Sequence, residues 1–92
     1  MANATVLRAW QDNYRAYLAV VVNEGAPQGN VEYIGSVSIT DDLASVGFPG
    51  QTWSQLSNTD KKTALVTATK AVRDLLRAAQ VIVSGITGTV TI

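Results

Sequence analysis

Two groups of polar side chains could in principle carry chemistry, and the first is an acidic pair. Asp41 and Asp42 are the only adjacent carboxylates in the chain, and paired carboxylates can share a proton or help to bind a calcium ion. Neighbouring side chains on a strand point to opposite faces, however, and residues 43–46 add no further carboxylate. We therefore interpret both aspartates as acids that favour the start of a helical segment.

The second group is Ser57 and Lys61, which stand four residues apart. On a helix they could touch, as a serine–lysine nucleophilic pair does. Ser57 nevertheless lies where a helix needs an N-terminal capping residue, and a lysine near the start of that helix is expected to be solvated. The chain has no His and no Cys, so the usual proton shuttle, thiolate nucleophile and common metal ligands are missing. The sequence thus predicts no catalytic, cofactor-binding or metal site, and a protein that is not an enzyme.

A third polar feature is a basic stripe on the helix expected after Ser57. At about 100° per residue, four cations and one valine share one side of that helix, roughly opposite its apolar positions. Such a stripe suits nucleic acid or an acidic protein surface, although a solvated helix face gives the same pattern. The valine favours contact with a partner, because an apolar residue among charges suits a binding surface. The candidate interaction face comprises Lys62, Val66, Lys70, Arg73 and Arg77.

The helix that would position this face is predicted over residues 58–79. Its apolar residues recur at steps of three and four, which places them on one side of a helix. Two capping patterns precede it, Thr52 with Gln55 and Ser57 with Asp60. Its small alanines would let the helix lie close to a sheet. The expected core positions are Ala64, Leu65, Ala68, Ala71, Val72, Leu75, Leu76 and Ala79.

Three strands are expected before the helix. Residues 31–40 alternate between apolar and polar side chains, which is typical of a half-buried strand, and the valine-rich residues 14–23 favour another. The turn-forming residues 24–30 between them predict a hairpin with a long loop. Residues 4–11 fit either a first strand, reversed by a tight turn at Asp12, or an N-terminal helix. We favour the strand, and hence a three-stranded meander.

The C-terminal tail, residues 81–92, is rich in β-branched side chains. Ile86, Val90 and Ile92 alternate with threonines, which predicts a closing strand that pairs within the sheet or adds to a neighbour's edge. Together these elements predict an α+β fold: a small antiparallel sheet, made of an N-terminal meander or hairpin plus a C-terminal strand, packed against one long amphipathic helix over residues 58–79.

Two smaller features concern the connector and the tryptophans. The connector, residues 41–51, is expected to contain a single helical turn that Gly47 closes. Trp10 and Trp53 are expected to anchor the core rather than to stack on nucleic-acid bases, because neither sits beside a basic cluster.

The composition is that of one small folded domain. The chain has 92 residues, of which 47% are apolar and 15% charged, so the disorder signature is missing. The longest apolar run, residues 18–22, is far below the ~20 residues that span a bilayer, and the N-terminus shows no secretory signal. We expect a single soluble domain over residues 1–92, with no membrane partner and no small-molecule substrate.

The net charge of zero hides a separation of charge along the chain. Residues 1–50 hold two cations against five acids, a net of −3, whereas residues 51–92 hold five cations against two acids, a net of +3. A polarised molecule could associate head to tail, and such contacts close into rings or extend into tubes. The charge separation is therefore one reason to expect self-association.

The segment from Trp53 to Thr69 resembles a pattern in small head–tail joining proteins of tailed phages. In that pattern a Trp precedes a short spacer, an acidic residue followed by Lys, and then Ala-Leu and Ala-Thr on a helix; here these are Trp53, Asp60-Lys61, Ala64-Leu65 and Ala68-Thr69. The matching segment covers about a fifth of the chain and carries over no functional residue. The resemblance implies a virion or virion-assembly protein.

The resulting hypothesis is a non-enzymatic structural protein, a small phage virion component of the head, head–tail joint or tail. It would form a homo-oligomer, contact other virion proteins and assemble in the host cytoplasm. The alternative is a nucleic-acid-binding accessory protein that uses Lys62, Lys70, Arg73 and Arg77. A small hydrolase or binding enzyme built on the acidic pair or on Ser57 and Lys61 is a third, less favoured class.

Overall fold

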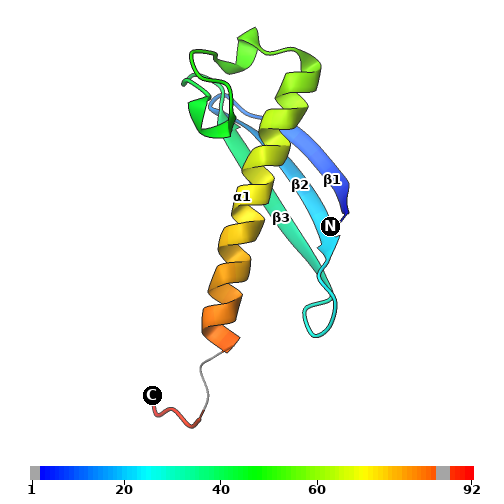
Figure 1. Ribbon diagram of the computed structural model, residues 1–92, viewed down its shortest axis with the longest axis vertical. Coiled ribbons are helices and arrows are strands. Elements are labelled where there is room, and N and C mark those ends of the chain that lie inside the picture. The colour runs from blue at the N-terminus through cyan, green and yellow to red at the C-terminus, as the bar shows by residue number, and fades with distance from the viewer. Residues whose placement is uncertain (1–2, 85–87) are drawn as a thin grey trace.

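A computed structural model of the chain describes the backbone of residues 3–84 and 88–92, and the side chains of residues 3–78 and 88–92. Three strands come first, β1 (Ala4–Gln11), β2 (Arg15–Asn23) and β3 (Asn30–Ser38), and one long helix, α1 (Asn58–Ser84), comes last. The strands form one antiparallel sheet in the order β1-β2-β3, and α1 crosses one face of it (Figure 1). This arrangement confirms the predicted α+β class and the N-terminal meander.

Two turns join the strands where the sequence predicts them. In the β1–β2 turn, Asp12 Oδ1 accepts hydrogen bonds from the backbone N–H groups of Tyr14 (2.7 Å) and Arg15 (2.8 Å), as aspartates in tight turns do. The β2–β3 loop is longer and closes with a bond from the backbone N–H of Glu24 to the carbonyl of Gly29 (2.8 Å). The tight turn and the long-loop hairpin are both confirmed.

The core lies between α1 and the inner face of the sheet, which is the face that α1 covers. Alternate residues of β2 and β3 point toward it, as the period of two requires. β1 takes no part, and all eight of its residues are exposed. A helix about 10 Å wide covers only about two strands spaced about 4.8 Å apart, so β1 lies outside its cover. The core residues are Ala16, Leu18, Val20, Val22, Tyr33, Val37, Leu43, Val46, Leu56, Ala64 and Leu65.

The closest approach of helix and sheet is at Gly35 and Thr69. A Cβ atom placed on Gly35 would lie 2.5 Å from both the Cα and the backbone N of Thr69, so only glycine fits here. Thr69 itself is 5% exposed and its hydroxyl donates to the carbonyl of Leu65 (2.7 Å), which satisfies the buried oxygen. Close packing thus depends on this glycine rather than on the helix alanines alone.

The connector between β3 and α1 contains two 3-10 turns, η1 (Ala44–Val46) and η2 (Trp53–Gln55). Gly47 follows η1 in a left-handed conformation, which confirms the predicted single turn and its end. Thr52 and Gln55 form the predicted capping box around η2. Trp53 is partly buried against the core, as predicted.

The helix begins at Asn58 as predicted but continues to Ser84, past the predicted end near residue 79. The predicted closing strand is wrong for the described residues: residues 81–84 are helical and residues 88–92 belong to no strand. Ile86 and Thr87, which the prediction included, lie outside the described residues. A β-branched run forms a strand only where it can pair with another strand, and α1 carries the chain end beyond the sheet (Figure 1).

Among the side chains described, up to residue 78, the apolar side of α1 packs on the core as far as Val72 and is exposed beyond it, while the predicted core position Ala79 lies outside the described side chains. Ala64 and Leu65 are in the core, but Leu75 is 71% exposed, Leu76 is 43% exposed and Ala71 is also exposed. The 27 residues of α1 span about 40 Å, whereas the nine residues of β2 span about 30 Å, so the helix outruns the sheet. Within the described part of the chain, no helix is both long and apolar enough to cross a membrane.

Candidate functional site

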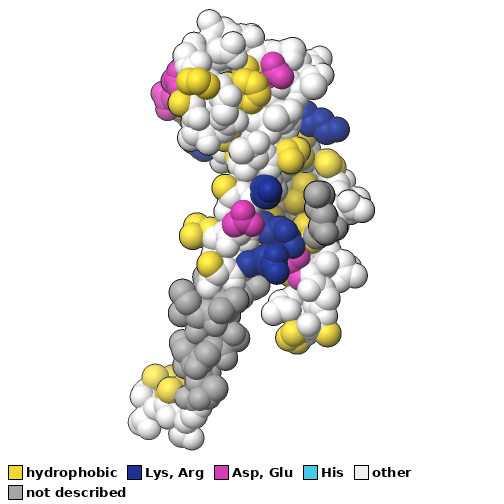
Figure 2. Space-filling model, viewed as in Figure 1, with side chains coloured by type: hydrophobic (Ala, Val, Ile, Leu, Met, Phe, Trp, Pro, Cys, Tyr) yellow, Lys and Arg dark blue, Asp and Glu magenta, His cyan; other side chains and the backbone are white. Residues whose placement is uncertain are grey.

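The predicted basic stripe flanks the sheet instead of standing opposite to it. Lys62, Val66 and Lys70 are exposed, whereas Arg73 is only partly exposed and lies beside the β2–β3 loop. Dark-blue Lys and Arg side chains gather along this side of α1, with acidic side chains next to them (Figure 2). Thr69, the residue before Lys70, is buried against the sheet. The side of α1 that contacts the sheet therefore lies next to the stripe. The five candidate residues therefore do not form one free cationic surface.

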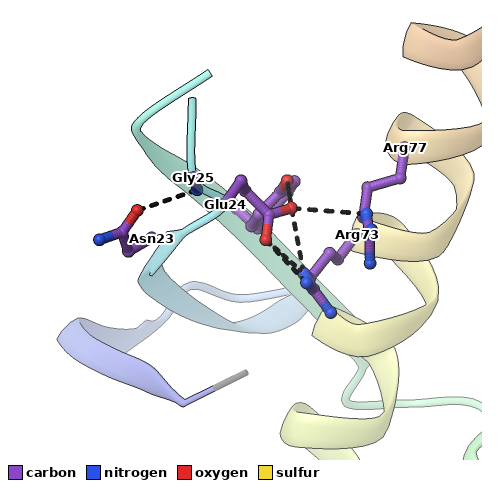
Figure 3. A network of polar contacts seen from close by, with 6 residues as sticks. Asn23, Glu24, Gly25, Arg73 and Arg77 are labelled. Carbon is purple, nitrogen blue, oxygen red and sulfur yellow. Dashed lines mark hydrogen bonds and ion pairs between the residues drawn. The ribbon is translucent and has the colours of Figure 1, made fainter. Parts of the chain in front are cut away.

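Arg73 and Arg77 point toward the carboxylate of Glu24 (Figure 3). Arg73 donates from Nη2 to Oε1 (2.7 Å) and from Nε to both oxygens (3.2 Å each), while Arg77 Nε lies 3.7 Å from Oε2. Tyr33 completes the cluster, since its hydroxyl donates to Oε2 of Glu24 at 2.6 Å. The Glu24 side chain is only 6% exposed. These four residues form the Glu24 cluster, which joins the β2–β3 loop to the helix.

The loop conformation aims Glu24 at the helix. Asn23 Oδ1 accepts a hydrogen bond from the backbone N–H of Gly25 (2.9 Å), and Gly25 has a φ of 78°, which favours glycine. The hydrogen bonds from Arg73 and then Tyr33 lower the pKa of Glu24, so the carboxylate stays charged. Burial, followed by the bond to Glu24, raises the pKa of Tyr33. The cluster is built as a fixed ion pair, which is a structural role.

The acidic pair is also engaged by the backbone. Asp42 accepts hydrogen bonds from the backbone N–H groups of Ala44 (2.8 Å, to Oδ1) and Gly50 (to Oδ2). Asp42 thus forms a turn just before η1, whose N-cap is Leu43, and ties the connector together. Among the described residues, no group of three or more His, Cys, Asp or Glu side chains could hold a metal ion.

Ser57 and Lys61 do not form a nucleophilic pair. The Ser57 hydroxyl accepts a hydrogen bond from the backbone N–H of Asp60 (3.1 Å), which makes it the N-cap of α1. The Lys61 ammonium instead lies over the ring of Trp53, 5.4 Å from its centre. Each side chain therefore has its own local partner.

The outer face of the sheet, which α1 does not cover, carries the most extensive surface network. Cross-strand pairing places Arg8, Ala19 and Ile34 level with one another on this face. One step along the sheet, Trp10 lies beside Tyr17. In the other direction β2 and β3 contribute a further pair, Val21 and Glu32.

The side chains of this face contact one another in a continuous chain. Arg8 Nη1 lies 3.7 Å from Oε1 of Glu32, and the Arg8 guanidinium lies 4.7 Å from the centre of the Trp10 ring. Trp10 in turn stacks on Tyr17, with ring centres 4.9 Å apart and planes 10° apart, and Tyr17 donates its hydroxyl to Asp12 Oδ2 (2.8 Å). We call these five residues the outer-face network. They hold rigid aromatic rings and an arginine at the surface, the residue types that dominate protein interfaces.

The position of Trp10 corrects its prediction as a core anchor. Its side chain is 37% exposed on the outer face, because its cross-strand partner Tyr17 shares that face and α1 lies on the other. One signal could have revealed this face. Residues 16–22 of β2 are all apolar or aromatic, which is typical of a strand covered on both sides, while one helix covers one side only.

The comparisons with protein-family models, with curated proteins and with solved structures found no match for this chain.

Proposed function

We propose that this chain is a non-enzymatic structural protein that assembles with copies of itself and with other proteins, as a small virion component of a tailed phage. The observation that supports assembly is the uncovered sheet. β1 is exposed along its whole length, and the outer face presents Trp10 and Ile34, which are 37% and 42% exposed. Large apolar side chains grouped on an uncovered face favour contact with another protein.

The overall dimensions support the same proposal. The radius of gyration is 16.1 Å, compared with about 12 Å for a compact domain of this length. An extended monomer buries less of its own surface, and assembly is one way for a small chain to bury more. The virion assignment is supported by the resemblance of residues 53–69 to head–tail joining proteins.

The competing nucleic-acid function loses support at the basic stripe. Arg73 and Arg77 both face Glu24, so part of their charge is already neutralised within the molecule. Lys62 and Lys70 stay exposed, and two lysines supply a small share of the phosphate contacts that nucleic-acid binding needs.

Native mass spectrometry over a range of protein concentrations tests the assembly proposal. We expect a defined oligomer whose fraction rises with concentration. A strict monomer at every concentration, confirmed by light scattering, would contradict it. Mass spectrometry of purified phage particles from the source cells tests the virion assignment, and particles without this chain would contradict that part.

A further inference from the structure

We infer that the outer face of the sheet binds the same face of a second copy, around a twofold axis, with Arg8 of each copy next to Glu32 of the other. The inference rests on the proposed self-association and specifies its surface, its symmetry and its charged contacts. The occupant is a second copy of this chain, for the reasons of charge, composition and area that follow.

The charges of the outer face are self-complementary. Arg8 lies on β1 and Glu32 on β3, on opposite sides of β2, and their side chains are 56% and 45% exposed. A twofold axis above β2 and parallel to it would place β1 of one copy over β3 of the other. Each Arg8 then lies over Ile34 of the second copy, two residues along β3 from Glu32. Its long side chain spans this offset, and the two ion pairs become a group of four alternating charges. A twofold contact requires this kind of self-complementarity.

Apolar and aromatic side chains flank the Arg8–Glu32 ion pair, whose charged ends meet across β2. On β2 Tyr17 and Val21 are partly exposed, and Ile34 is exposed beside them on β3. Aromatic residues and arginine are enriched in protein interfaces. The contacts of Trp10 with Arg8 and Tyr17 hold its ring in place before binding, which lowers the entropy that binding costs.

The local charge favours a protein over a nucleic acid. Exposed aromatic rings on an antiparallel sheet can also stack on the bases of single-stranded nucleic acid, but such surfaces are strongly cationic. Here Arg8 and Arg15 are balanced by Asp12 and Glu32 on or beside the same face. A balanced face suits a copy of itself.

The area of the outer face indicates how tightly the dimer should bind. Three strands about 4.8 Å apart and about 30 Å long give roughly 400 Å² per copy, or about 800 Å² in total, which is below the standard size of a specific interface and in the range of weak contacts. We therefore expect a dimer that forms at micromolar or higher concentration. Two sheets packed face to face would lie about 10 Å apart.

A charge-exchange experiment tests this arrangement. The Arg8→Glu variant carries two acids at these positions and the Glu32→Arg variant two cations, so each alone should dimerise at least about tenfold more weakly than the wild type. An equimolar mixture of the two variants should recover a heterodimer, seen by its mass. Recovery requires the Arg–Glu contacts to run between copies, because the ion pair within each copy stays broken in the mixture.

A matched pair of variants controls for net charge alone. Lys70→Glu and Asp74→Lys change the net charge by the same amounts at exposed positions of α1. Each should dimerise like the wild type, and their mixture should give homodimers and heterodimers in statistical proportion. Circular dichroism confirms that every variant is folded. If Arg8→Glu does not fold, Ile34→Arg, at a position that is 42% exposed, replaces it and should also weaken the dimer.

Each outcome has one meaning. If the wild type and the Arg8→Glu and Glu32→Arg variants all form homodimers of equal affinity, this interface is wrong and self-association remains. If only a Leu75→Asp variant loses the dimer, the contact lies toward the end of α1 instead. If the two charge variants lose their homodimers and their mixture forms no heterodimer, the Arg8–Glu32 contacts do not run between copies. If a single-stranded oligonucleotide binds and competes with dimer formation, the outer face binds nucleic acid rather than a second copy. A strictly monomeric wild type would overturn both this inference and the proposed function.

Discussion

At the scale of single residues, Glu24 shows how one carboxylate connects parts of the chain that are far apart in sequence. It lies just after β2, and its partner Arg73 is 49 positions later on α1. A carboxylate that is 6% exposed would be costly to bury alone, but the guanidinium and the Tyr33 hydroxyl compensate for the lost water. The cluster therefore links loop to helix and should make folding stability depend on pH.

Replacing Glu24 with Gln tests that link. Because the folded-state pKa of Glu24 is lowered, its contribution is fully present above the unfolded-state pKa and is lost as the pH falls through the folded-state pKa. Wild-type stability should fall as the pH drops below about 4.5, the ordinary pKa of a glutamate side chain. Glu24→Gln should be less stable at pH 7 and should lose much of this acid dependence, measured by urea unfolding against pH. Asp41→Asn removes an exposed carboxylate and should keep the wild-type slope.

Gly35 tests the close approach of helix and sheet. In Gly35→Ala the added Cβ meets backbone atoms of Thr69, so helix or strand must shift, at a cost of about 1–3 kcal/mol or more. Adding Thr69→Ala should not restore stability, because the contacted Cα and N atoms remain. Ser54→Ala, at an exposed position of η2, is the control and should change stability by less than about 0.5 kcal/mol. Thermal unfolding measures all three, and a Gly35→Ala variant as stable as wild type would contradict the packing.

At the scale of elements, α1 begins at the residue after its N-cap and extends beyond the part that packs on the sheet. Ser57 binds the Asp60 amide, and the helix starts at the next position, Asn58. Toward the other end Leu75 and Leu76 are exposed, so packing against the sheet no longer limits the length of the helix. The backbone of β1 pairs with β2 on one side, and Arg8 adds an ion pair with Glu32 on β3.

Ser57→Ala should destabilise the protein by about 1 kcal/mol, because the Asp60 amide loses its acceptor. Chemical unfolding monitored by helix circular dichroism measures this loss. Thr59→Ala, at an exposed position in the first turn, serves as the control. It should be neutral or slightly stabilising, since alanine favours helix more than threonine does. Equal losses in both variants would show that the cap has no special role.

At the scale of the whole molecule, the two oppositely charged halves of the sequence meet inside one copy. Glu24 comes from the acidic half and Arg73 and Arg77 from the basic half, so part of the predicted charge separation is neutralised within the fold. The charge that would drive head-to-tail association is reduced accordingly. The uncovered apolar face of the sheet carries the proposed association instead.

The salt dependence of assembly distinguishes head-to-tail association through opposite charges from the proposed face-to-face dimer. At about 1 M salt the Debye length is about 3 Å, so an assembly held by opposite charges should weaken steeply. A dimer held by Trp10, Tyr17 and Ile34 should lose less than about tenfold in affinity, because salt does not weaken apolar burial. Sedimentation velocity at low and high salt measures the difference. Complete dissociation at high salt would favour the head-to-tail arrangement.

The sequence by itself determined the local elements. The alternation in residues 31–40, the turn formers around Asp12 and at 24–30, and the cap at Ser57 act over a few residues, and each element formed where they predict it. The apolar pattern of residues 16–22 is typical of a strand covered on both faces, but the prediction used this segment only as evidence for a strand.

Tertiary structure alone decided which surfaces are covered. The β-branched tail did not form its predicted strand, because strand pairing depends on a partner that local propensity cannot specify. Trp10 is exposed because it lies on the face of the sheet opposite α1. Arg73 is paired with Glu24 because α1 passes beside the β2–β3 loop, and Gly35 allows the close approach of the helix. Periodicity shows that a side chain lies on one face of an element; only the packing of elements decides whether that face meets the core or stays open.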